Sequence, residues 1–289
     1  MERGYVLYNP HAGDGNCAEN AEILDVLFQE ELLYFDICRI TNYAAFLRDL
    51  QPDDFLIIAG GDGTLNRFVN DTAHLKIHQR ILYFPVGSGN DFARDMGAAA
   101  YAMPMDVTNA LSNLPQVTVK GETHRFINGV GYGIDGYCCK RGDELRTQEQ
   151  KKTNYTSIAI GGLLGKYHPT NALVEVDGKR FTYKNVWIAP TMQGRYYGGG
   201  MMPTPDQNRF GKDGRLSLMM FHHTGPLRTL CIFPNLFKGT HIKHKKCVCI
   251  HTGRDITVTF DRPTPLQIDG ETIDDVTSYH AFIQADTMG

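Results

Sequence analysis

FLIIAGGDGTLNRF, residues 55–68, is the stretch that decides the fold. It opens with Phe55–Ala59, an unbroken apolar run that is typical of a strand buried on both faces. Gly60-Gly61-Asp62-Gly63-Thr64 ends the run, and a helical pattern follows over Leu65–Thr72. A strand, a glycine-rich turn and a helix, in this order, form the repeating unit of a parallel sheet with helices on its faces.

The turn also predicts a phosphate site. Glycines let the backbone approach a ligand closely, and free N–H groups at the start of a helix attract anions. Asp62 would repel phosphate unless a cation lies between them, and Mg²⁺ prefers oxygen ligands and bridges phosphate oxygens. Thr64 can donate to a phosphate or cap the helix. The turn is neither a P-loop nor G-x-G-x-x-G, and taken alone it could need its glycines only for geometry.

The alternation of strands and helices extends on both sides of this stretch. We expect strands at Gly4–Tyr8, Tyr34–Ile40 and Arg80–Val86, helices at Glu19–Glu31 and Tyr43–Leu50, and a helix cap at Thr41-Asn42. Two more glycine-rich loops, 9–15 and 87–91, follow the first and last of these strands. Ligands of such sheets bind beyond the carboxyl ends of the strands, so the three loops should meet at one edge.

The second half of the sequence has a different pattern and consists mainly of short runs that resemble β-strands. These runs are Gln116–Lys120, Arg125–Asn128, Ala172–Val176, Lys179–Ile188, Arg215–Phe221, Lys246–His251, Asp255–Phe260, Pro265–Ile268 and Ser278–Gln284. Asp177-Gly178 predicts a tight hairpin between two of them. Helices are expected near Thr153–Lys166 and Pro226–Lys238. This half is therefore predicted to be an antiparallel sheet, of the kind that can fold as a β-sandwich.

Composition sets broad limits on the class of protein. The 289 residues are 42% hydrophobic and 21% charged, as in soluble globular proteins, and provide one large domain or two smaller ones. A net charge of −3 gives no general attraction to nucleic acid. No apolar run is long enough to cross a bilayer, and the first residues have no signal-peptide pattern. Seven scattered cysteines then predict reduced thiols in a cytosolic protein.

In order along nearly the whole chain, the motifs resemble those of the diacylglycerol kinase catalytic family, in its bacterial soluble lipid-kinase branch. They are N-P-x-A-G-x-G at 9–15, G-G-D-G-T-L-N at 60–66, P-V-G-S-G-N-D-F-A-R at 85–94, F-I-N at 126–128, G-x-G-I-D-G at 131–136, G-K-D-G-R-L at 211–216, G-x-H-x-K-H at 239–244 and P-L-Q-I-D-G-E at 265–271. G-G-D-G-T alone is shared with NAD kinases and phosphofructokinases, whereas G-S-G-N-D-F-A-R together with I-D-G-E is much more specific.

The resemblance implies an α/β plus β architecture. Residues 1–118 would form a Rossmann-like, parallel-sheet nucleotide domain and residues 119–289 an antiparallel β-sandwich for the lipid substrate, with the last residues packing back on the first domain. The active site would lie in the cleft between them. The implied activity is Mg²⁺-dependent transfer of the ATP γ-phosphoryl group to the hydroxyl of diacylglycerol or a related lipid alcohol. A cytoplasmic enzyme that visits the membrane surface is implied too and, by resemblance alone, a homodimer.

The family's site residues carry over position by position. Those that would hold the nucleotide are Asn9, Thr41, Gly60, Gly61, Asp62, Gly63, Thr64, Leu65, Asn66 and Ser88. Asp62 and Asp91 would organise the catalytic magnesium. Glu271 would be the general base that takes the proton of the lipid hydroxyl, although its local sequence alone favours an exposed turn.

A second, structural magnesium site is also implied. It would consist of Asp213 with the backbone carbonyls of Phe210 and Arg215.

Two departures from the family pattern keep other functions open. Arg67 stands where family members commonly have Glu, and it could bind ATP or simply face solvent. Thr118 stands about where the soluble bacterial branch commonly has an Asp. A weakened metal network would favour a non-catalytic nucleotide or lipid sensor. The shared G-G-D-G-T also leaves an NAD kinase-like enzyme for a soluble metabolite as an alternative.

Residues 241–249 combine histidines, cysteines and lysines. His241, His244, Cys247 and Cys249 are zinc-ligand types, but the interleaved lysines and the alternating pattern favour an ordinary strand. With Arg228 and Lys238, the same segment is the clearest basic patch of the chain, which suggests contact with anionic lipid or a solvated loop.

Overall fold

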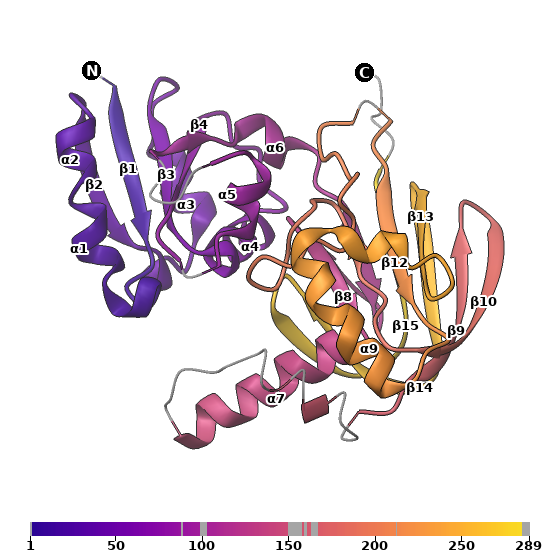
Figure 1. The fold of residues 1–289 in the computed structure, drawn as a ribbon. Helices are drawn as coiled ribbons and strands as arrows, with labels where there is room; N and C mark the ends of the chain where they lie inside the picture. Colours follow the sequence, from indigo (N-terminus) through magenta and orange to yellow (C-terminus); the bar gives the residue numbers. More distant parts are fainter. Residues whose placement is uncertain are drawn as a thin grey trace. The chain divides into compact units, whose positions relative to one another are not determined.

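The computed structural model describes residues 2–87, 89–98, 103–149, 158, 161–162, 167–211 and 213–284. The chain forms two compact units, Met1–Leu114 and Pro115–Gly289 (Figure 1). The division falls a few residues before the expected boundary at 118, because the strand that begins at Gln116 pairs within the second sheet.

The first unit is built on a five-stranded sheet with the order β2-β1-β3-β4-β5. Its strands are β1 Arg3–Tyr8, β2 Glu31–Asp36, β3 Phe55–Gly60, β4 Arg80–Pro85 and β5 Met105–Asp106. The first four are parallel, and β5 is antiparallel to β4. Every residue of the central strand β3 is buried, which confirms the parallel-sheet interpretation of its apolar run.

Short helices connect these strands. They are η1 Gly13–Gly15, α1 Cys17–Ala21, α2 Leu24–Leu27, η2 Ile37–Arg39, α3 Tyr43–Arg48, α4 Asp62–Asp71, α5 Asp91–Asp95 and α6 Thr108–Ser112. Asn42 caps α3 as predicted, because its side chain accepts a hydrogen bond from the Ala45 N–H. The helix expected at Glu19–Glu31 is instead two short helices, and the chain is extended again by Phe28.

Two other boundaries in the first unit differ from expectation. The second strand ends at Asp36 because the Asp36 carboxylate accepts a hydrogen bond from the Cys38 N–H and starts the turn η2. Helix α4 begins at Asp62 rather than Leu65. The carboxylate and hydroxyl of the glycine motif therefore lie in the first helical turn.

The second unit contains a ten-stranded sheet whose pairings are all antiparallel, as predicted. Its strands are β6 Gln116–Val119, β7 Glu122–Arg125, β8 Gly129–Tyr132, β9 Thr170–Val176, β10 Lys179–Val186, β11 Thr191–Met192, β12 Leu216–Phe221, β13 Val248–Gly253, β14 Asp255–Ile268 and β15 Glu271–Phe282. The path runs β13-β12-β11-β8-β14-β15-β6-β7, with the hairpin β9–β10 attached to β14. Asp177 and Gly178, both at positive φ, form the predicted hairpin turn.

The helical segments of this unit are α7 Ile134–Glu149, α9 Pro226–Ile232, η4 Phe233–Lys238 and η5 Thr240–Lys243. The sequence did not predict α7, whose Gly136 lets the helix approach the backbone of β14 closely: a Cβ there would lie 1.8 Å from the Pro265 carbonyl oxygen. The helix expected at Thr153–Lys166 lies for the most part outside the described residues. Within the described part of the chain, no helix is long and apolar enough to cross a membrane.

Candidate active site

The glycine-rich loops after β1, β3 and β4 are in contact at one edge of the first sheet. A Cβ added to Gly87 would lie 2.4 Å from the Cα of Gly61, and one added to Gly13 would lie 2.4 Å from the Val86 carbonyl oxygen. The Asn9 N–H donates to the Ala59 carbonyl at 3.0 Å, which joins the first loop to β3. Side chains larger than hydrogen would therefore push the loops apart.

Asn9 and Thr64 form a polar pair across two of these loops. The Asn9 amide donates from Nδ2 to the Thr64 hydroxyl oxygen at 2.8 Å, and its Oδ1 accepts from the His11 N–H at 3.0 Å. Because Asn9 uses the hydroxyl as an acceptor, the hydroxyl hydrogen of Thr64 is available to a further acceptor. A phosphate oxygen at the start of α4 would suit it.

Asp62 joins the loop after β3 to helix α5. Its carboxylate accepts the Asp91 N–H at 2.8 Å through Oδ2 and the Phe92 N–H at 2.9 Å through Oδ1. These are N–H groups that a helix leaves unpaired at its start. Asp62 therefore caps α5 from a different helix, and this fixes its position beside Asp91.

Both carboxyl groups also influence one buried hydroxyl, that of Tyr83. Burial, and after it the charges of Asp62 and Asp91, raises the pKa of Tyr83 well above its usual value. Tyr83 donates to the Gly60 carbonyl at 3.3 Å. Asp91 is only 3% exposed, with Arg94 Nη1 3.7 Å from its Oδ1. Two acidic residues on adjacent loops, one of them buried, are typical of a divalent-cation site.

Asn90 is a site residue that the sequence reasoning missed. It adopts the left-handed conformation, φ 50°, and its Nδ2 donates to the carbonyls of Gly87 at 2.7 Å and Pro85 at 3.3 Å. Its Oδ1 is buried and accepts no hydrogen bond from the described residues. A buried oxygen without a donor, next to Asp91, fits a metal ion or metal-bound water. Its place in G-S-G-N-D was the available signal; Ser88 lies outside the described residues.

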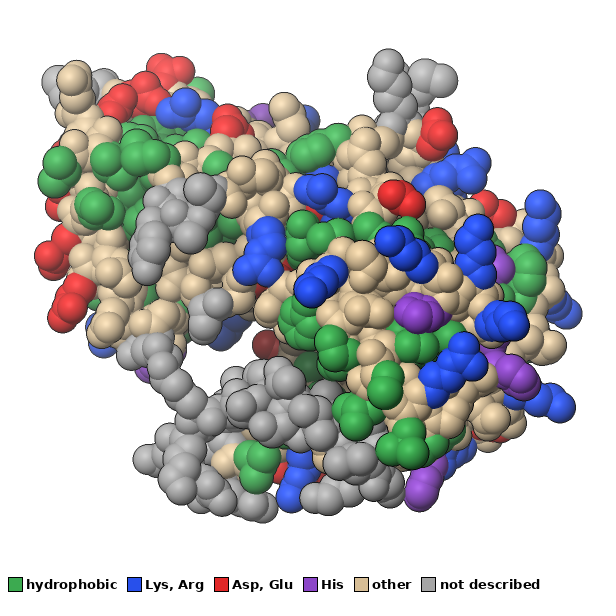
Figure 2. All heavy atoms as spheres, viewed as in Figure 1, with side chains coloured by type: hydrophobic (Ala, Val, Ile, Leu, Met, Phe, Trp, Pro, Cys, Tyr) green, Lys and Arg blue, Asp and Glu red, His purple; other side chains and the backbone are tan. Residues whose placement is uncertain are grey.

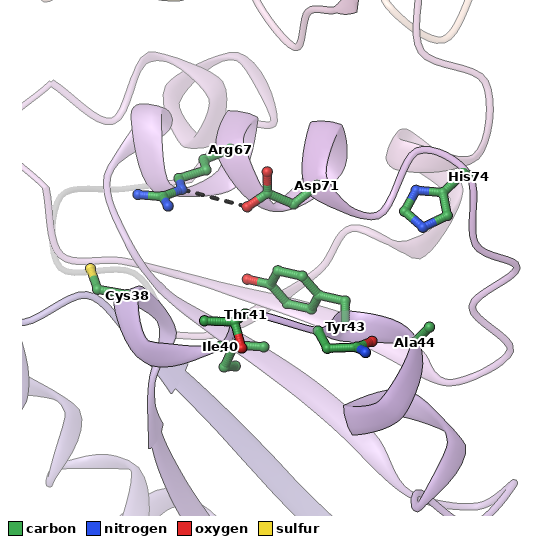
Figure 3. A pocket seen from close by; sticks show the side chains of 9 residues that line it. Cys38, Ile40, Thr41, Tyr43, Ala44, Arg67, Asp71 and His74 are labelled. Atoms are coloured by element: carbon green, nitrogen blue, oxygen red, sulfur yellow. Dashed lines mark ion pairs between the residues drawn. The ribbon is translucent and has the colours of Figure 1, made fainter.

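A pocket of about 450 Å³ lies alongside α4 in the first unit (Figure 3). Its lining residues are Cys38, Ile40, Thr41, Asn42, Tyr43, Ala44, Arg67, Asp71 and His74. Arg67 and Asp71 come from α4 and form an ion pair, Nε to Oδ2, at 3.5 Å, while Thr41 lies on the opposite side. Arg67 is about 7.5 Å farther along the helix axis than Asp62. The pocket thus lies along the same helix that begins at the glycine turn.

In the second unit, Asp269 joins the F-I-N and I-D-G-E motifs. Its carboxylate accepts the N–H groups of Ile127 at 2.6 Å, Asn128 at 2.9 Å and Gly129 at 2.9 Å. Asp269 and Gly270, both at positive φ, form the two-residue turn between β14 and β15. Glu271 follows as the first residue of β15, paired with Ile268, and its side chain is exposed.

Arg209 supplies positive charge to the same loop, and the sequence reasoning had not singled it out. Its guanidinium donates to the Ile127 carbonyl at 3.1 Å and to Asn128 Oδ1 at 3.3 Å. Asn128 is buried, and its own carbonyl accepts the Gln193 N–H at 2.8 Å. Asp269, Arg209 and Gln193 therefore all hold the F-I-N loop, next to the turn that precedes Glu271.

Two protein-family models match the chain, one over most of each unit. The family model described as "Diacylglycerol kinase catalytic domain" matches residues 3–124, and the one described as "YegS C-terminal NAD kinase beta sandwich-like domain" matches residues 128–283. Over these two ranges the chain belongs to the diacylglycerol kinase catalytic family and to the YegS C-terminal domain family. It is a lipid kinase of the bacterial branch, as the motifs predicted.

Individual members of the family are distant from this lipid kinase in sequence but match most of its length. "Diacylglycerol kinase" of Bacillus subtilis (strain 168) is 25% identical over 94% of this chain and 90% of its own length. "Diacylglycerol kinase" of Staphylococcus carnosus (strain TM300) is 26% identical over 93% of this chain and 89% of its own. A crystal structure of a diacylglycerol kinase from Bacillus anthracis str. Sterne shares the fold, with 18% identity, a TM-score of 0.60 and coverage of 98% of this chain and 93% of that one.

The loop expected to hold the lipid kinase's structural magnesium precedes β12. Phe210, Asp213 and Arg215 lie within it, and the Asp213 side chain is exposed. The Arg215 carbonyl already accepts Gln207 Nε2 at 2.7 Å, which leaves one of its two lone pairs for a cation. Oxygen ligands of this kind suit Mg²⁺.

Two other sequence features have ordinary roles in the structure. Thr118, in the place of the branch's common Asp, exchanges a hydrogen bond at 2.9 Å with the Thr123 hydroxyl on the neighbouring strand β7. His241 is buried, with Nε2 2.8 Å from the Pro203 carbonyl oxygen. Among the described residues, no group of three or more His, Cys, Asp or Glu side chains could hold a metal ion, which argues against the zinc alternative.

Proposed function

We propose that this lipid kinase transfers the γ-phosphoryl group of ATP, with Mg²⁺, to the hydroxyl of diacylglycerol or a related lipid alcohol. The observation that carries the proposal is the adjacency of Asp62 and Asp91 where three glycine-rich loops touch. This arrangement offers backbone N–H groups for phosphate and two carboxylates for a cation at the same place. The names of the relatives in Bacillus subtilis and Staphylococcus carnosus support diacylglycerol as the acceptor.

The first unit would bind and orient the nucleotide. The backbone of Gly60–Gly63 and the hydroxyl of Thr64 would contact the phosphates, and the pocket lined by Thr41 and Arg67 would take the nucleoside end. Asp62, Asp91 and Asn90 would hold the metal, the last through Oδ1, which accepts no hydrogen bond from the residues that the structure describes. When bound, Mg²⁺ would neutralise charge on the phosphate oxygens as the β–γ bond breaks.

The second unit would present the lipid hydroxyl. As its oxygen bonds to the γ-phosphorus and ADP leaves, the hydroxyl proton passes to the Glu271 carboxylate. Asp269 positions this base by holding the turn before it to the F-I-N loop. Phe210, Asp213 and Arg215 would hold the second magnesium as structural support.

Diacylglycerol resides in membranes, so the proposal includes a transient, peripheral visit of a cytoplasmic enzyme to the membrane surface. The homodimer suggested by resemblance belongs to the same proposal, and sedimentation equilibrium of the purified chain tests it directly.

A direct test of the proposal uses purified protein, Mg²⁺ and γ-labelled ATP. Mixed micelles of several lipid alcohols are offered in separate tubes, with NAD in another, and the products are separated by extraction and chromatography. Label in the organic phase identifies a lipid acceptor, and omission of Mg²⁺ should abolish it. Label only in a soluble dinucleotide would instead favour the NAD kinase-like alternative, and ATP binding without transfer would favour the sensor.

A further inference from the structure

A long segment of the second unit contains basic residues and no acidic ones. Between Asp213 and Asp255 the sequence has no Asp or Glu, although the whole chain has a net charge of −3. The Lys and Arg residues of this segment are Arg215, Arg228, Lys238, Lys243, Lys245, Lys246 and Arg254. Such an asymmetry creates a positive field over one part of the surface.

The segment folds into β12, α9, η4, η5 and β13, so its charges are gathered on neighbouring elements. Arg228 lies in the first turn of α9 and Lys238 is the last residue of η4. Lys243, Lys245 and Lys246 follow just beyond this helical pair, and all five side chains are exposed. In Figure 2, Lys and Arg side chains are spread over the part of the second unit where Figure 1 shows α9, with hydrophobic side chains between them.

The solvent side of α9–η4 carries apolar side chains beside its two basic ones, which is unusual for a surface helix. One side of the pair packs into a hydrophobic cluster through Ile232, Phe233 and Leu236. The opposite side should then be polar. It instead exposes Leu227 at 71%, Phe237 at 41% and, between them, Cys231 and Pro234.

We propose that Leu227, Phe237, Arg228, Lys238, Lys243, Lys245 and Lys246 form a docking surface for an anionic phospholipid bilayer. Leu227 and Phe237 enter the interface, while the basic side chains remain at the level of the headgroups. The inference rests on the proposed function, since an enzyme that phosphorylates a lipid alcohol must meet a membrane.

The mixture of residues favours a bilayer over other polyanions. A nucleic acid would neutralise the lysines but would leave Leu227 and Phe237 facing water. An anionic bilayer accommodates the basic and the apolar side chains together, because it offers negative headgroups with an apolar layer beneath them. Each basic residue near such a surface strengthens binding about fivefold.

The first test measures co-sedimentation of the full chain with vesicles, without nucleotide or diacylglycerol. The vesicles are phosphatidylcholine alone, or phosphatidylcholine and phosphatidylglycerol in equal parts. We expect binding to the anionic vesicles only, and weaker binding as salt rises. Lys245→Glu with Lys246→Glu should weaken this binding by at least about 25-fold.

The matched control reverses the same amount of charge elsewhere on the second unit. Lys179 and Lys184 are exposed on β10, outside the docking surface, and Lys179→Glu with Lys184→Glu should leave most of the binding intact. Equal loss in both variants would overturn the proposal in favour of a general charge effect. Absence of wild-type binding to anionic vesicles, or equal binding by all three proteins, would overturn it as well.

A second pair of variants tests the apolar contribution at constant charge. Leu227→Ser with Phe237→Ser should reduce binding by at least about tenfold, an effect that persists in high salt. The control is Ile23→Ser with Val26→Ser, which removes exposed apolar side chains from the first unit. Unchanged binding of the Leu227 and Phe237 variant would show that these side chains do not enter the bilayer.

Kinase assays separate this proposal from the proposed function. With a short-chain diacylglycerol dispersed in neutral detergent, the docking variants should keep wild-type turnover and lose it only on anionic vesicles. Vesicle binding without any kinase activity would leave the docking surface standing and overturn the assigned reaction. Stronger binding to single-stranded DNA than to anionic vesicles, lost in the Lys245 and Lys246 variant, would overturn the bilayer as the partner.

Discussion

The carboxylate of Asp62 accepts the backbone N–H of Asp91 at 2.8 Å and so brings two acidic residues from separate loops together. Its other oxygen accepts the Phe92 N–H, and helix α5 is capped by a side chain from α4. The fold itself thus holds the Asp62 carboxylate beside Asp91. A preorganised site of this kind spends little free energy on rearrangement when charge develops.

Replacement of Asp62 tests whether it serves both the fold and the metal. Asp62→Asn places an NH₂ group against one of the two N–H donors, so we expect a loss of about 1–3 kcal/mol in the free energy of unfolding. Kinase activity should fall by at least about 100-fold at saturating Mg²⁺, because one proposed metal ligand loses its charge. Urea unfolding and steady-state kinetics measure the two effects.

The control for this variant is Asp53→Asn, in the exposed loop before β3, which should change neither quantity. Reduced stability with normal activity would make Asp62 a helix cap only.

Glu271→Gln separates catalysis from stability. The side chain is exposed at the start of β15, so its replacement should leave urea unfolding unchanged. If Glu271 takes the lipid proton, kcat should fall by about 10²–10⁴-fold while ATP binding is kept. Glu122→Gln, on the exposed strand β7, is the matched control in the same unit. Full activity in the Glu271 variant would reject the assigned base.

Arg67 departs from the family pattern, and its place in the lining of the pocket makes nucleotide binding by this residue testable. It lines the pocket opposite Thr41 and is paired with Asp71 at 3.5 Å. If it contacts the nucleotide, Arg67→Ala should raise KM for ATP about tenfold with little change in kcat, as expected for a charged hydrogen bond that is the same in ground and transition states.

Lys76→Ala, just beyond α4 and exposed, is the control for this substitution. The same KM in both variants would mean that Arg67 only faces solvent.

The parallel sheet could be predicted from sequence because Phe55–Ala59 is apolar throughout and ends in glycine. Local sequence patterns predicted the structure less well where tertiary contacts determine it. Asp255–Phe260 and Pro265–Ile268 looked like two strands, but they are one, β14, whose pairing register with β15 shifts between Thr259 and Thr264. Helix α7 was missed because its sequence has two glycines and a weak apolar pattern, while its place is set by close packing on β14.

The same limit applies to the candidate site. Motifs pointed to Asp62, Asp91 and Glu271, but the cap that Asp62 provides for α5 depends on a contact between residues far apart in sequence. Asn90 was overlooked for a similar reason: only the folded loop shows that its Oδ1 is buried and lacks a donor within the described part of the chain. The motifs name the residues, and the structure adds the hydrogen bonds that hold these residues in place.

A buried acid in the second unit makes a prediction about pH. Burial raises the pKa of Asp135 to about 7, although the Tyr197 hydroxyl donates to its Oδ2 at 2.5 Å and favours the charged form. In the unfolded chain an Asp has its usual pKa near 3.9. Between about pH 4 and pH 7 the folded protein therefore keeps a proton that the unfolded chain has lost, and its stability falls as pH rises through this window.

Asp135→Asn imitates the protonated acid and should remove this dependence. Relative to the wild type, the variant's free energy of unfolding should increase between pH 4 and pH 7.5 by on the order of 4 kcal/mol. Urea unfolding at closely spaced pH values measures the difference. Burial lowers the pKa of His222, His241 and His251, which destabilises the fold at acid pH, but both proteins share these groups and the difference cancels them. The control Asp206→Asn, at an exposed position, should give a curve parallel to the wild type, and a parallel curve for Asp135→Asn would mean that Asp135 ionises normally in the folded protein.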